Sequence, residues 1–273
     1  MKKGFIIFSD INYFDIVDNL ITSVLLFSKY DIEFNCINFI KEYSNPRIKC
    51  KQININNHNF FNITKCKLIS SINTDFDLAL LLDGDMIVTP EIDNIFIDNE
   101  DIIVNKQIPL FCKHPHNPFM SYEHIFKLLG MNKTPKMKYV YSVYMFTKTQ
   151  IWFFQKALDI MNNISFNNTE NLYYPIPEES VLNYLLSEYE VDYDMGYCYH
   201  INGFEENVEY YLNPLSVKEI CLKGKKSIED TYLNCDCPVK IYAFHGHKIK
   251  DVNYGKKVIE KMKKMKNENY KLI

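Results

Sequence analysis

The sequence has no apolar run that could cross a bilayer and no large excess of charge of one sign. A transmembrane helix needs roughly 18–20 consecutive apolar residues, and no stretch of this chain approaches that length. The formal net charge is -3, which provides no strong basic field for nucleic acid. We therefore expect a protein without a transmembrane segment and without nucleic acid as a partner.

The sequence also shows no disulfide framework, signal peptide, internal repeat or low-complexity linker. Its eight cysteines are scattered through 273 residues, a chain too long to need disulfides for stability. The first apolar run spans four residues and ends in Ser9-Asp10, unlike the core of a secretory signal. We expect a cytoplasmic protein with mostly free thiols. The composition predicts one domain over residues 1–250, followed by a basic helix or tail over 251–273.

Apolar segments alternate with segments of helical periodicity, which is typical of an α/β protein. A short buried strand over 5–8, an amphipathic helix over 13–30 and a strand over 32–40 predict a β-α-β unit with parallel strands. We expect further strands and helices downstream. The strands are expected at 47–53, 78–82, 108–113, 139–146 and 239–248, and the helices at 64–74, 149–162, 177–189 and 256–272.

Two of the predicted parallel strands end in acidic residues. Ser9-Asp10 ends the first strand, and Asp83-Gly84-Asp85 follows the apolar strand 78–82. In an open α/β sheet, ligands bind beyond the carboxyl ends of the strands. We therefore expect these carboxylates to lie at the same edge of the sheet.

The pair Asp83 and Asp85 has the chemistry of a divalent metal site. Two neighbouring carboxylates repel each other, and a cation removes that cost. Hard oxygen ligands suit Mg²⁺ or Mn²⁺, whose open positions phosphate oxygens can fill. Gly84 permits a tight turn between the two carboxylates. The alternative is an acidic turn that faces solvent, since Asp-Gly is a common turn pair.

A third metal ligand is expected from the later stretch "AFHGHK". His245 follows an apolar strand, and an imidazole suits Mn²⁺ better than Mg²⁺. Whether His247 joins the site stays open. Lys248 is a candidate for contact with phosphate. The alternative is a surface turn that contains two histidines.

Several segments resemble retaining glycosyltransferases of family 8, the glycogenin and bacterial galactosyltransferase type. "FSDINYFDIVDNLITSVLLFS" resembles the opening segment of that family, with Asp10, Asn12, Tyr13 and Ser23 at matching positions. "LLLDGDMIV" resembles the Asp-x-Asp strand of the family, and "YVYSVYMFTKTQIWFF" resembles a later sheet and helix segment. "PEESVLNYLL" is similar to an acidic helix start near the sugar, and "FHGHK" to a late His-Gly-Lys motif.

The resemblance implies a GT-A fold, with a Rossmann-like, open, mixed and mainly parallel sheet flanked by helices. It implies transfer of a sugar from a nucleotide-sugar, a UDP-sugar in that family, with retention. Ser9, Asp10, Asn12 and Tyr13 would hold the nucleotide, by ribose hydrogen bonding from Asp10 and base stacking on Tyr13. Asp83, Asp85 and His245 would bind Mn²⁺ or Mg²⁺.

The remaining implied roles concern the diphosphate and the sugar. Gly84, Gly246 and Lys248 would lie near the phosphates. Glu179 would orient a sugar or assist the reaction centre, although an acidic residue at a helix N-terminus is also favoured by the helix dipole. The acceptor, whether glycan, lipid or protein, is not defined by the sequence.

Two other functions remain open. A haloacid dehalogenase-like phosphohydrolase also places Asp-x-Asp after an apolar strand, but normally on the first strand, whereas a β-α-β unit precedes it here. A catalytically degenerate protein that binds nucleotide-sugars or acts as a scaffold would keep the fold without turnover. The lysine-rich segment after residue 255 predicts either a solvated helix packed by one narrow face or a weak peripheral contact with an anionic membrane.

Overall fold

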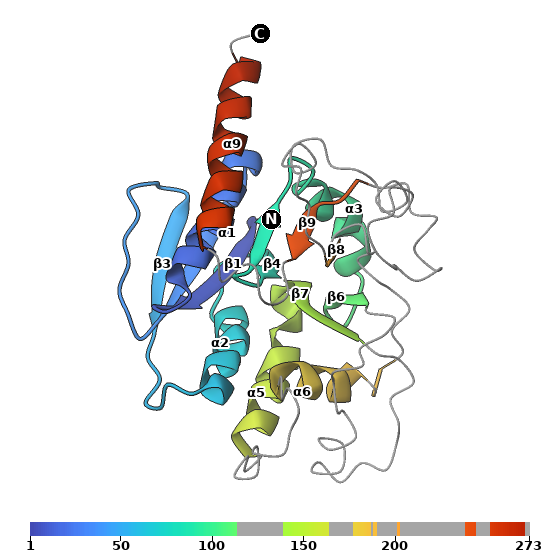
Figure 1. Cartoon of the computed structure of the whole chain (residues 1–273). Helices are drawn as coiled ribbons and strands as arrows, with labels where there is room; N and C mark the ends of the chain where they lie inside the picture. The colour runs from blue at the N-terminus through green and yellow to red at the C-terminus, as the bar shows by residue number, and fades with distance from the viewer. Residues whose placement is uncertain are drawn as a thin grey trace.

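A computed structural model describes residues 1–113, 139–163, 177–186, 188–189, 201–202, 238–243 and 252–270. The strands of its main sheet are β1 (Lys3–Asp10), β2 (Asp31–Ile37), β3 (Ile48–Ile53), β4 (Leu78–Leu82), β6 (Leu110–Lys113) and β7 (Tyr139–Thr147). Their order in the sheet is β3-β2-β1-β4-β7-β6 (Figure 1). The first four strands in this order are parallel, and β7 is antiparallel to both of its neighbours.

A small second sheet extends from the end of β4. Its strands are β5 (Met86–Val88), β8 (Ile201–Asn202) and β9 (Ile241–Ala243), in the order β5-β9-β8. β5 begins directly after Asp83-Gly84-Asp85 and pairs antiparallel with β9, so that Met86 lies opposite Ala243. The acidic stretch is therefore the link between the two sheets.

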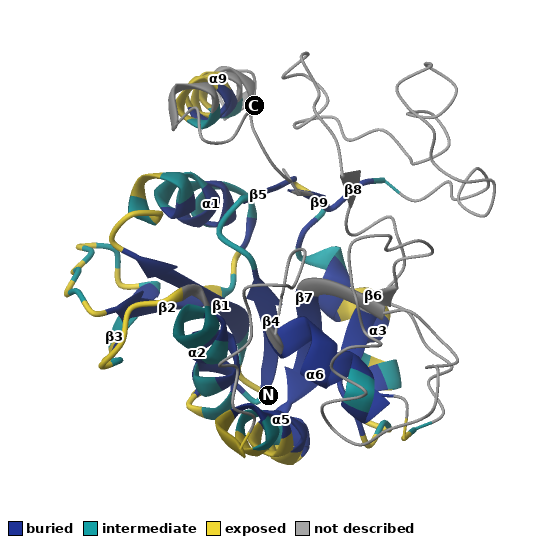
Figure 2. Cartoon of the chain, turned by 60° about the horizontal axis from the view of Figure 1, so that its bottom comes forward, coloured by how far each residue is buried: buried dark blue, intermediate teal, exposed yellow. Residues whose placement is uncertain are grey.

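Helices cover both faces of the main sheet (Figure 2). They are α1 (Phe14–Phe27), α2 (Phe60–Ile72), α3 (Asn94–Ile103), the 3₁₀ turn η1 (Lys148–Gln150), α5 (Ile151–Asn163), α6 (Pro177–Leu186) and α9 (Val252–Tyr270). Residues of α1, α3 and α9 join one apolar core, and residues of α2, α5 and α6 join the other. β4 lies between them and is buried along its whole length, which explains its continuous apolar sequence.

The predicted open, mixed and mainly parallel sheet flanked by helices is confirmed. α9 begins at Val252, four residues before its predicted start, and α2 begins at Phe60, also four residues before its predicted start. Asn59 caps this helix, because its side chain accepts a hydrogen bond from the backbone N–H of Asn62 at 2.9 Å. β2 ends at Ile37 rather than at residue 40, because Asn38 adopts a left-handed conformation with φ 57°.

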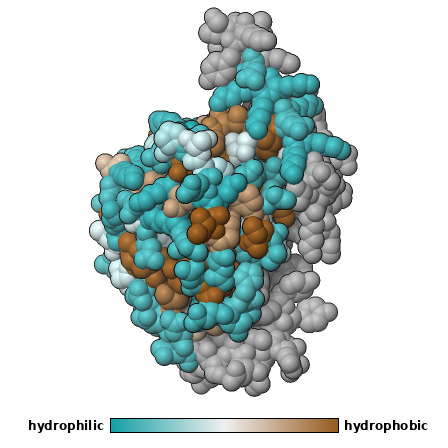
Figure 3. Space-filling view, turned by 90° about the vertical axis from the view of Figure 1, so that its left-hand side faces the viewer, coloured by the Kyte–Doolittle hydropathy of each residue, from teal (hydrophilic) through white to brown (hydrophobic). Residues whose placement is uncertain are grey.

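The lysine-rich helix α9 packs against α1. Val258, Ile259 and Met262 are buried on the side that faces the core, and a Cβ atom on Gly255 would lie 2.5 Å from the side-chain nitrogen of Asn19. The predicted helix with one narrow packed face is confirmed. Among the described helices, none is both long and apolar enough to cross a membrane. Figure 3 views the molecule from the left-hand side of Figure 1. On this face, hydrophilic side chains cover most of the described surface.

Arg47 connects the carboxyl end of α1 to the sheet by hydrogen bonds. Its guanidinium group donates hydrogen bonds to the backbone carbonyl oxygens of Ser28 and Tyr30, both at 2.6 Å, and of Leu25 at 3.3 Å. These carbonyls have no helical partner of their own. Arg47 therefore has a structural role at the edge of the sheet away from the acidic residues.

Candidate functional site

The two acidic strand ends lie together, as predicted. β1 and β4 are parallel neighbours with Ile7 opposite Leu82. Asp10 follows Ile7 by three residues, and Asp83 follows Leu82 directly. Both carboxylates therefore leave the sheet at the carboxyl edge of adjacent strands, which is the edge where α/β folds bind ligands.

Asp10 organises the turn between β1 and α1. Its carboxylate is almost completely buried, and its Oδ1 atom accepts hydrogen bonds from the backbone N–H groups of Asn12 at 2.8 Å and Tyr13 at 3.0 Å. Asn12 is exposed, and 55% of Tyr13 is accessible to solvent. The turn thus presents an aromatic ring and an amide beside a fixed carboxylate.

Two serines near this turn have local structural contacts. The Ser9 hydroxyl is buried and donates to the backbone oxygen of Asp10 at 2.6 Å. The Ser23 hydroxyl, also buried, donates to Leu20 at 2.8 Å and accepts from the backbone N–H of Val88 at 3.1 Å. Ser23 therefore connects α1 to β5, although the resemblance placed it in a segment that holds the nucleotide.

Gly84 is required by packing. A Cβ atom at this position would lie 2.5 Å from the Cγ2 atom of Val17 in α1, which is closer than real Cβ contacts. The tight turn between the two carboxylates, predicted from the sequence, is a second reason for glycine at this position and stays a prediction. The close approach of α1 keeps the Asp83-Gly84-Asp85 segment pressed against the helix that follows Asp10.

A buried lysine joins the first aspartate to the acidic start of α6. The Nζ atom of Lys67, on α2, lies 2.9 Å from Oδ1 of Asp83 and 2.9 Å from Oε1 of Glu178. Glu178 is completely buried, and its other oxygen, Oε2, has no hydrogen-bond donor among the described residues. Three elements, α2, the end of β4 and α6, thus meet at one ammonium group.

The charged groups at this site change one another's pKa values. Burial, together with the nearby charge of Asp83, raises the pKa of Asp85 to about 7, while Lys67 opposes the shift. Burial also raises the pKa of Glu178, again against the effect of Lys67. Burial alone would lower the pKa of Lys67, but Asp83, Glu178 and Glu179 outweigh it and hold this pKa well above its usual value. The site therefore carries a lysine cation and an excess of carboxyl groups.

Lys67 and the role of Glu178 were not predicted from the sequence. Glu179 was the predicted residue of this helix start; it is also buried, and its charge contributes to the pKa of Lys67. The available signal was a lysine between Cys66 and Leu68, which are buried on the same helix. A lysine on the packed side of a helix is uncommon unless it is paired.

The predicted third metal ligand lies outside the described residues, as do Gly246, His247 and Lys248. β9 ends at Ala243, opposite Met86 and thus one residue from Asp85 along the sequence. His245 follows two residues later. In the part of the chain that the structure describes, no group of three or more His, Cys, Asp or Glu residues could hold a metal ion. Of the predicted ligand set, the structure describes Asp83 and Asp85.

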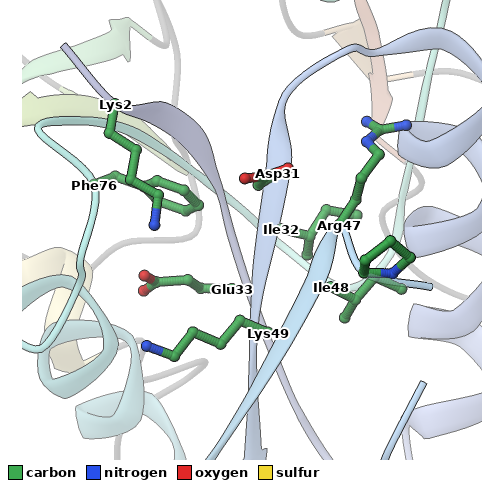
Figure 4. A pocket seen from close by; sticks show the side chains of 9 residues that line it. Lys2, Asp31, Ile32, Glu33, Arg47, Ile48, Lys49 and Phe76 are labelled. Atoms are coloured by element: carbon green, nitrogen blue, oxygen red, sulfur yellow. The ribbon is translucent and has the colours of Figure 1, made fainter. Parts of the chain in front are cut away.

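A pocket of about 340 Å³ lies at the opposite, amino edge of the sheet (Figure 4). Glu33, which lines it, is engaged by Lys51 at 2.9 Å and by the backbone N–H of Asp75 at 2.8 Å. Lys49 is also engaged, in an ion pair with Asp75 at 2.5 Å. Glu33 and Lys49 are thus paired within the protein, and the pocket is separate from the acidic edge.

We expect replacement of Lys67 by Met to destabilise the protein strongly. The variant leaves Asp83 and Glu178 without their shared cation, and removal of one partner of a buried ion pair costs about 3–5 kcal/mol. Urea unfolding at pH 7.5 measures the change. The loss should shrink as the pH is lowered, because Glu178, whose pKa is raised, becomes protonated and no longer needs the cation.

The matched control is Lys65→Met on the same helix. Lys65 donates to Asn162 in an exposed hydrogen bond of 2.9 Å, and its removal should cost at most about 1 kcal/mol. Equal stability of the two variants would contradict the bridging role of Lys67.

No protein-family model and no curated protein sequence matches this chain. Solved structures do match. The galactosyltransferase LgtC, in complex with donor and acceptor sugar analogs, is 12% identical with a TM-score of 0.57 over 94% of this chain and 95% of that chain. An active-site mutant of LgtC is 11% identical with a TM-score of 0.58 over the same shares.

The apo-form glycosyltransferase GlyE of Streptococcus pneumoniae TIGR4 is 13% identical, with a TM-score of 0.56 over 99% of this chain and 64% of that chain. These identities are low, so the likeness concerns the fold. The carboxylates at the strand ends thus lie on a scaffold shared with these enzymes: the chain has the fold of glycosyltransferases, a mixed and mainly parallel sheet of the GT-A type.

Proposed function

We propose that the chain is a metal-dependent glycosyltransferase that moves a sugar from a nucleotide-sugar, specifically a UDP-sugar, to an acceptor. The observation that carries the proposal is the acidic edge itself. Asp83 and Asp85 follow the central strand of a glycosyltransferase fold, one strand away from the buried Asp10 and the exposed Tyr13. Binding of such a donor requires carboxylates that hold a metal ion at its diphosphate and an aromatic ring on which its base stacks.

The described residues fit a divalent cation. The raised pKa of Asp85 reflects burial beside a second carboxylate, and a bound cation would favour the ionised form of both groups. Their oxygens suit Mn²⁺ or Mg²⁺. We assign His245 as the third ligand because β9 ends beside the start of β5, and an imidazole ligand favours Mn²⁺. When bound, the ion supplies Lewis-acid stabilisation of charge on the departing diphosphate.

The protein's own residues would position the donor. Tyr13 offers its exposed ring for stacking, and Asp10 and Asn12 offer hydrogen bonds to the nucleoside. Lys67 keeps Asp83 and Glu178 in a fixed arrangement, and preorganised charge is a large contributor to transition-state stabilisation. We assign Glu179 to the sugar, and Gly246 and Lys248 to the diphosphate. Retention of configuration rests on the sequence resemblance.

A phosphohydrolase is the less favoured function. Its Asp-x-Asp motif belongs on the first strand of the fold, whereas here the motif follows β4. The structural matches are to glycosyltransferases. A catalytically degenerate protein that binds nucleotide-sugars would keep the same geometry. A measurement of turnover distinguishes it from an active glycosyltransferase.

The acceptor and the cellular setting are part of the proposal. We infer a cytoplasmic enzyme whose acceptor is a glycan, a lipid or a protein. The exposed lysines of α9 would allow weak contact with an anionic membrane. Because Val258, Ile259 and Met262 are buried in the core, such contact would be electrostatic and would weaken with salt.

Asp85→Asn should abolish metal-dependent turnover while the fold survives. The amide cannot provide an anionic ligand, and loss of one preorganised charge contact reduces rates by about 10²–10³-fold. Release of nucleoside diphosphate from a panel of nucleotide-sugars, with Mn²⁺ or with EDTA, measures turnover. Thermal stability at pH 7.5 should stay equal or rise, since burial penalises the ionised Asp85.

Asp159→Asn on the exposed side of α5 is the matched control and should keep full activity; Asp159 contacts Gln155 on the surface. Wild-type activity in Asp85→Asn would exclude the metal site. Absence of turnover in the folded wild type, with nucleotide binding retained, would favour the degenerate binding protein.

Metal affinity should weaken as the pH falls through about 7. Asp85, with its pKa raised to about 7, must lose its proton to bind the ion, and His245 must be neutral, with an ordinary pKa near 6.5. Calorimetric titration of Mn²⁺ at several pH values measures this. Below about pH 6 the logarithm of the affinity should fall by about two per pH unit in the wild type and by about one in His245→Gln. A flat affinity between about pH 5.5 and 7.5 would contradict both ligand assignments.

A further inference from the structure

His58 lies on the other side of Asp10 from the Asp83-Gly84-Asp85 segment. It belongs to the connection between β3 and α2, and β3 is separated from β4 by β2 and β1. In the register of the sheet, Asp10 is aligned with Ile37, and Ile37 with Ile53, five residues before His58. His58 therefore enters the same carboxyl edge from its far end.

The connection that carries His58 is held at both ends. Asn38 donates to the backbone oxygen of Ile55 at 3.0 Å and accepts from its N–H at 2.8 Å. On the other side, the side chain of Asn59 caps α2, and the backbone oxygen of Asn57 accepts from the N–H of Asn59 at 3.0 Å. His58 thus has a defined position between two anchored points.

The imidazole faces the buried carboxylate of Asp10. Nε2 of His58 lies 3.5 Å from Oδ2 of Asp10, while the other oxygen, Oδ1, is occupied by the two backbone N–H groups of the turn. About a third of the His58 side chain is exposed, against 4% for Asp10. A distance of 3.5 Å is too long for a strong hydrogen bond, so each group retains capacity for a ligand.

Together the two groups present an acceptor beside a donor. The carboxylate of Asp10 accepts a hydrogen bond, and Nε2–H of a neutral imidazole donates one. The matching ligand edge is an N–H group next to a carbonyl, as in uracil, thymine or guanine. Cytosine bound in the same orientation presents a lone pair to Asp10 and an amino group to His58, and would leave both protein groups unsatisfied.

The strand order indicates that the nucleobase is the part of the donor that would lie beside His58 and Asp10. A donor whose diphosphate lies at Asp83 and Asp85 extends its nucleoside away from β4. The distance from β4 to β3 is three strand spacings, about 14 Å, which is comparable to the length of a nucleoside diphosphate. Tyr13, whose backbone N–H is bound to Asp10, offers its ring for stacking next to the same pair.

We propose that His58 is a specificity-determining residue that reads the nucleobase together with Asp10, by donating a hydrogen bond to a base carbonyl whose neighbouring N–H binds Asp10. This inference rests on the proposed function, since it assumes a nucleotide at the acidic edge. It assigns Asp10 to the base edge rather than to the ribose.

Calorimetric binding of UDP, GDP, CDP and ADP, each with Mn²⁺, tests the proposal. The wild type should bind UDP, GDP or both at least about tenfold more tightly than CDP and ADP, and the preferred one identifies the base. His58→Ala should weaken the preferred nucleotide about tenfold and leave CDP unchanged. His58→Gln, whose amide also donates, should recover most of the affinity.

Asn57→Ala in the same exposed connection is the matched control and should behave as the wild type. An equal loss for all four nucleotides in His58→Ala, or no loss, would overturn the role of His58 in base recognition. Equal binding of all four by the wild type would also overturn it. Absence of Mn²⁺-dependent binding of every nucleotide by the folded wild type would instead reject the proposed function itself.

Discussion

The confinement of negative charge at the carboxyl edge of the sheet is the constraint on which the site depends. Asp83, Asp85, Glu178 and Glu179 gather where β4 ends and α6 begins, and Lys67 contacts Asp83 and Glu178 at 2.9 Å each. One cation cannot compensate all of these groups, and burial, with the charge of Asp83 as a further cause, raises the pKa values of Asp85 and Glu178. A divalent metal would complete the compensation, so the same charges that cost folding energy would create affinity for the donor complex.

Packing keeps these charges in place. α1 approaches so closely that Gly84 has no room for a side chain beside Val17, and Ser23 ties the same helix to β5. Lys67 reaches the site from α2, on the opposite face of the sheet. The acidic segment is thus held from both layers, which is the rigid support that a precise ligand geometry needs.

Much of this arrangement could be predicted because it depends on short sequence patterns. Continuous apolar runs identify buried strands such as β4, and the carboxylates directly after such runs predicted that Asp10 and Asp83 lie at the same edge of the sheet, which the structure confirms. Their role in binding a ligand stays a prediction. The antiparallel direction of β7 could not be derived, since it depends on a long connection. Lys67, Glu178 and His58 were missed because their partners lie far away in sequence: only the assembled sheet brings α2, α6 and the segment after β3 to one edge. The packing of Gly84 against Val17 was also missed, because this contact is tertiary.

The most direct test of the account is thermal unfolding of the full chain with UDP and UDP-sugars, with and without Mn²⁺. Ligand at about 100 times its dissociation constant stabilises a protein by about 2.7 kcal/mol, which for a chain of this size raises the midpoint by about 5–10 °C. The account predicts such a shift only when Mn²⁺ and the nucleotide are both present. An unchanged midpoint with every nucleotide, in a sample that unfolds cooperatively, would contradict it.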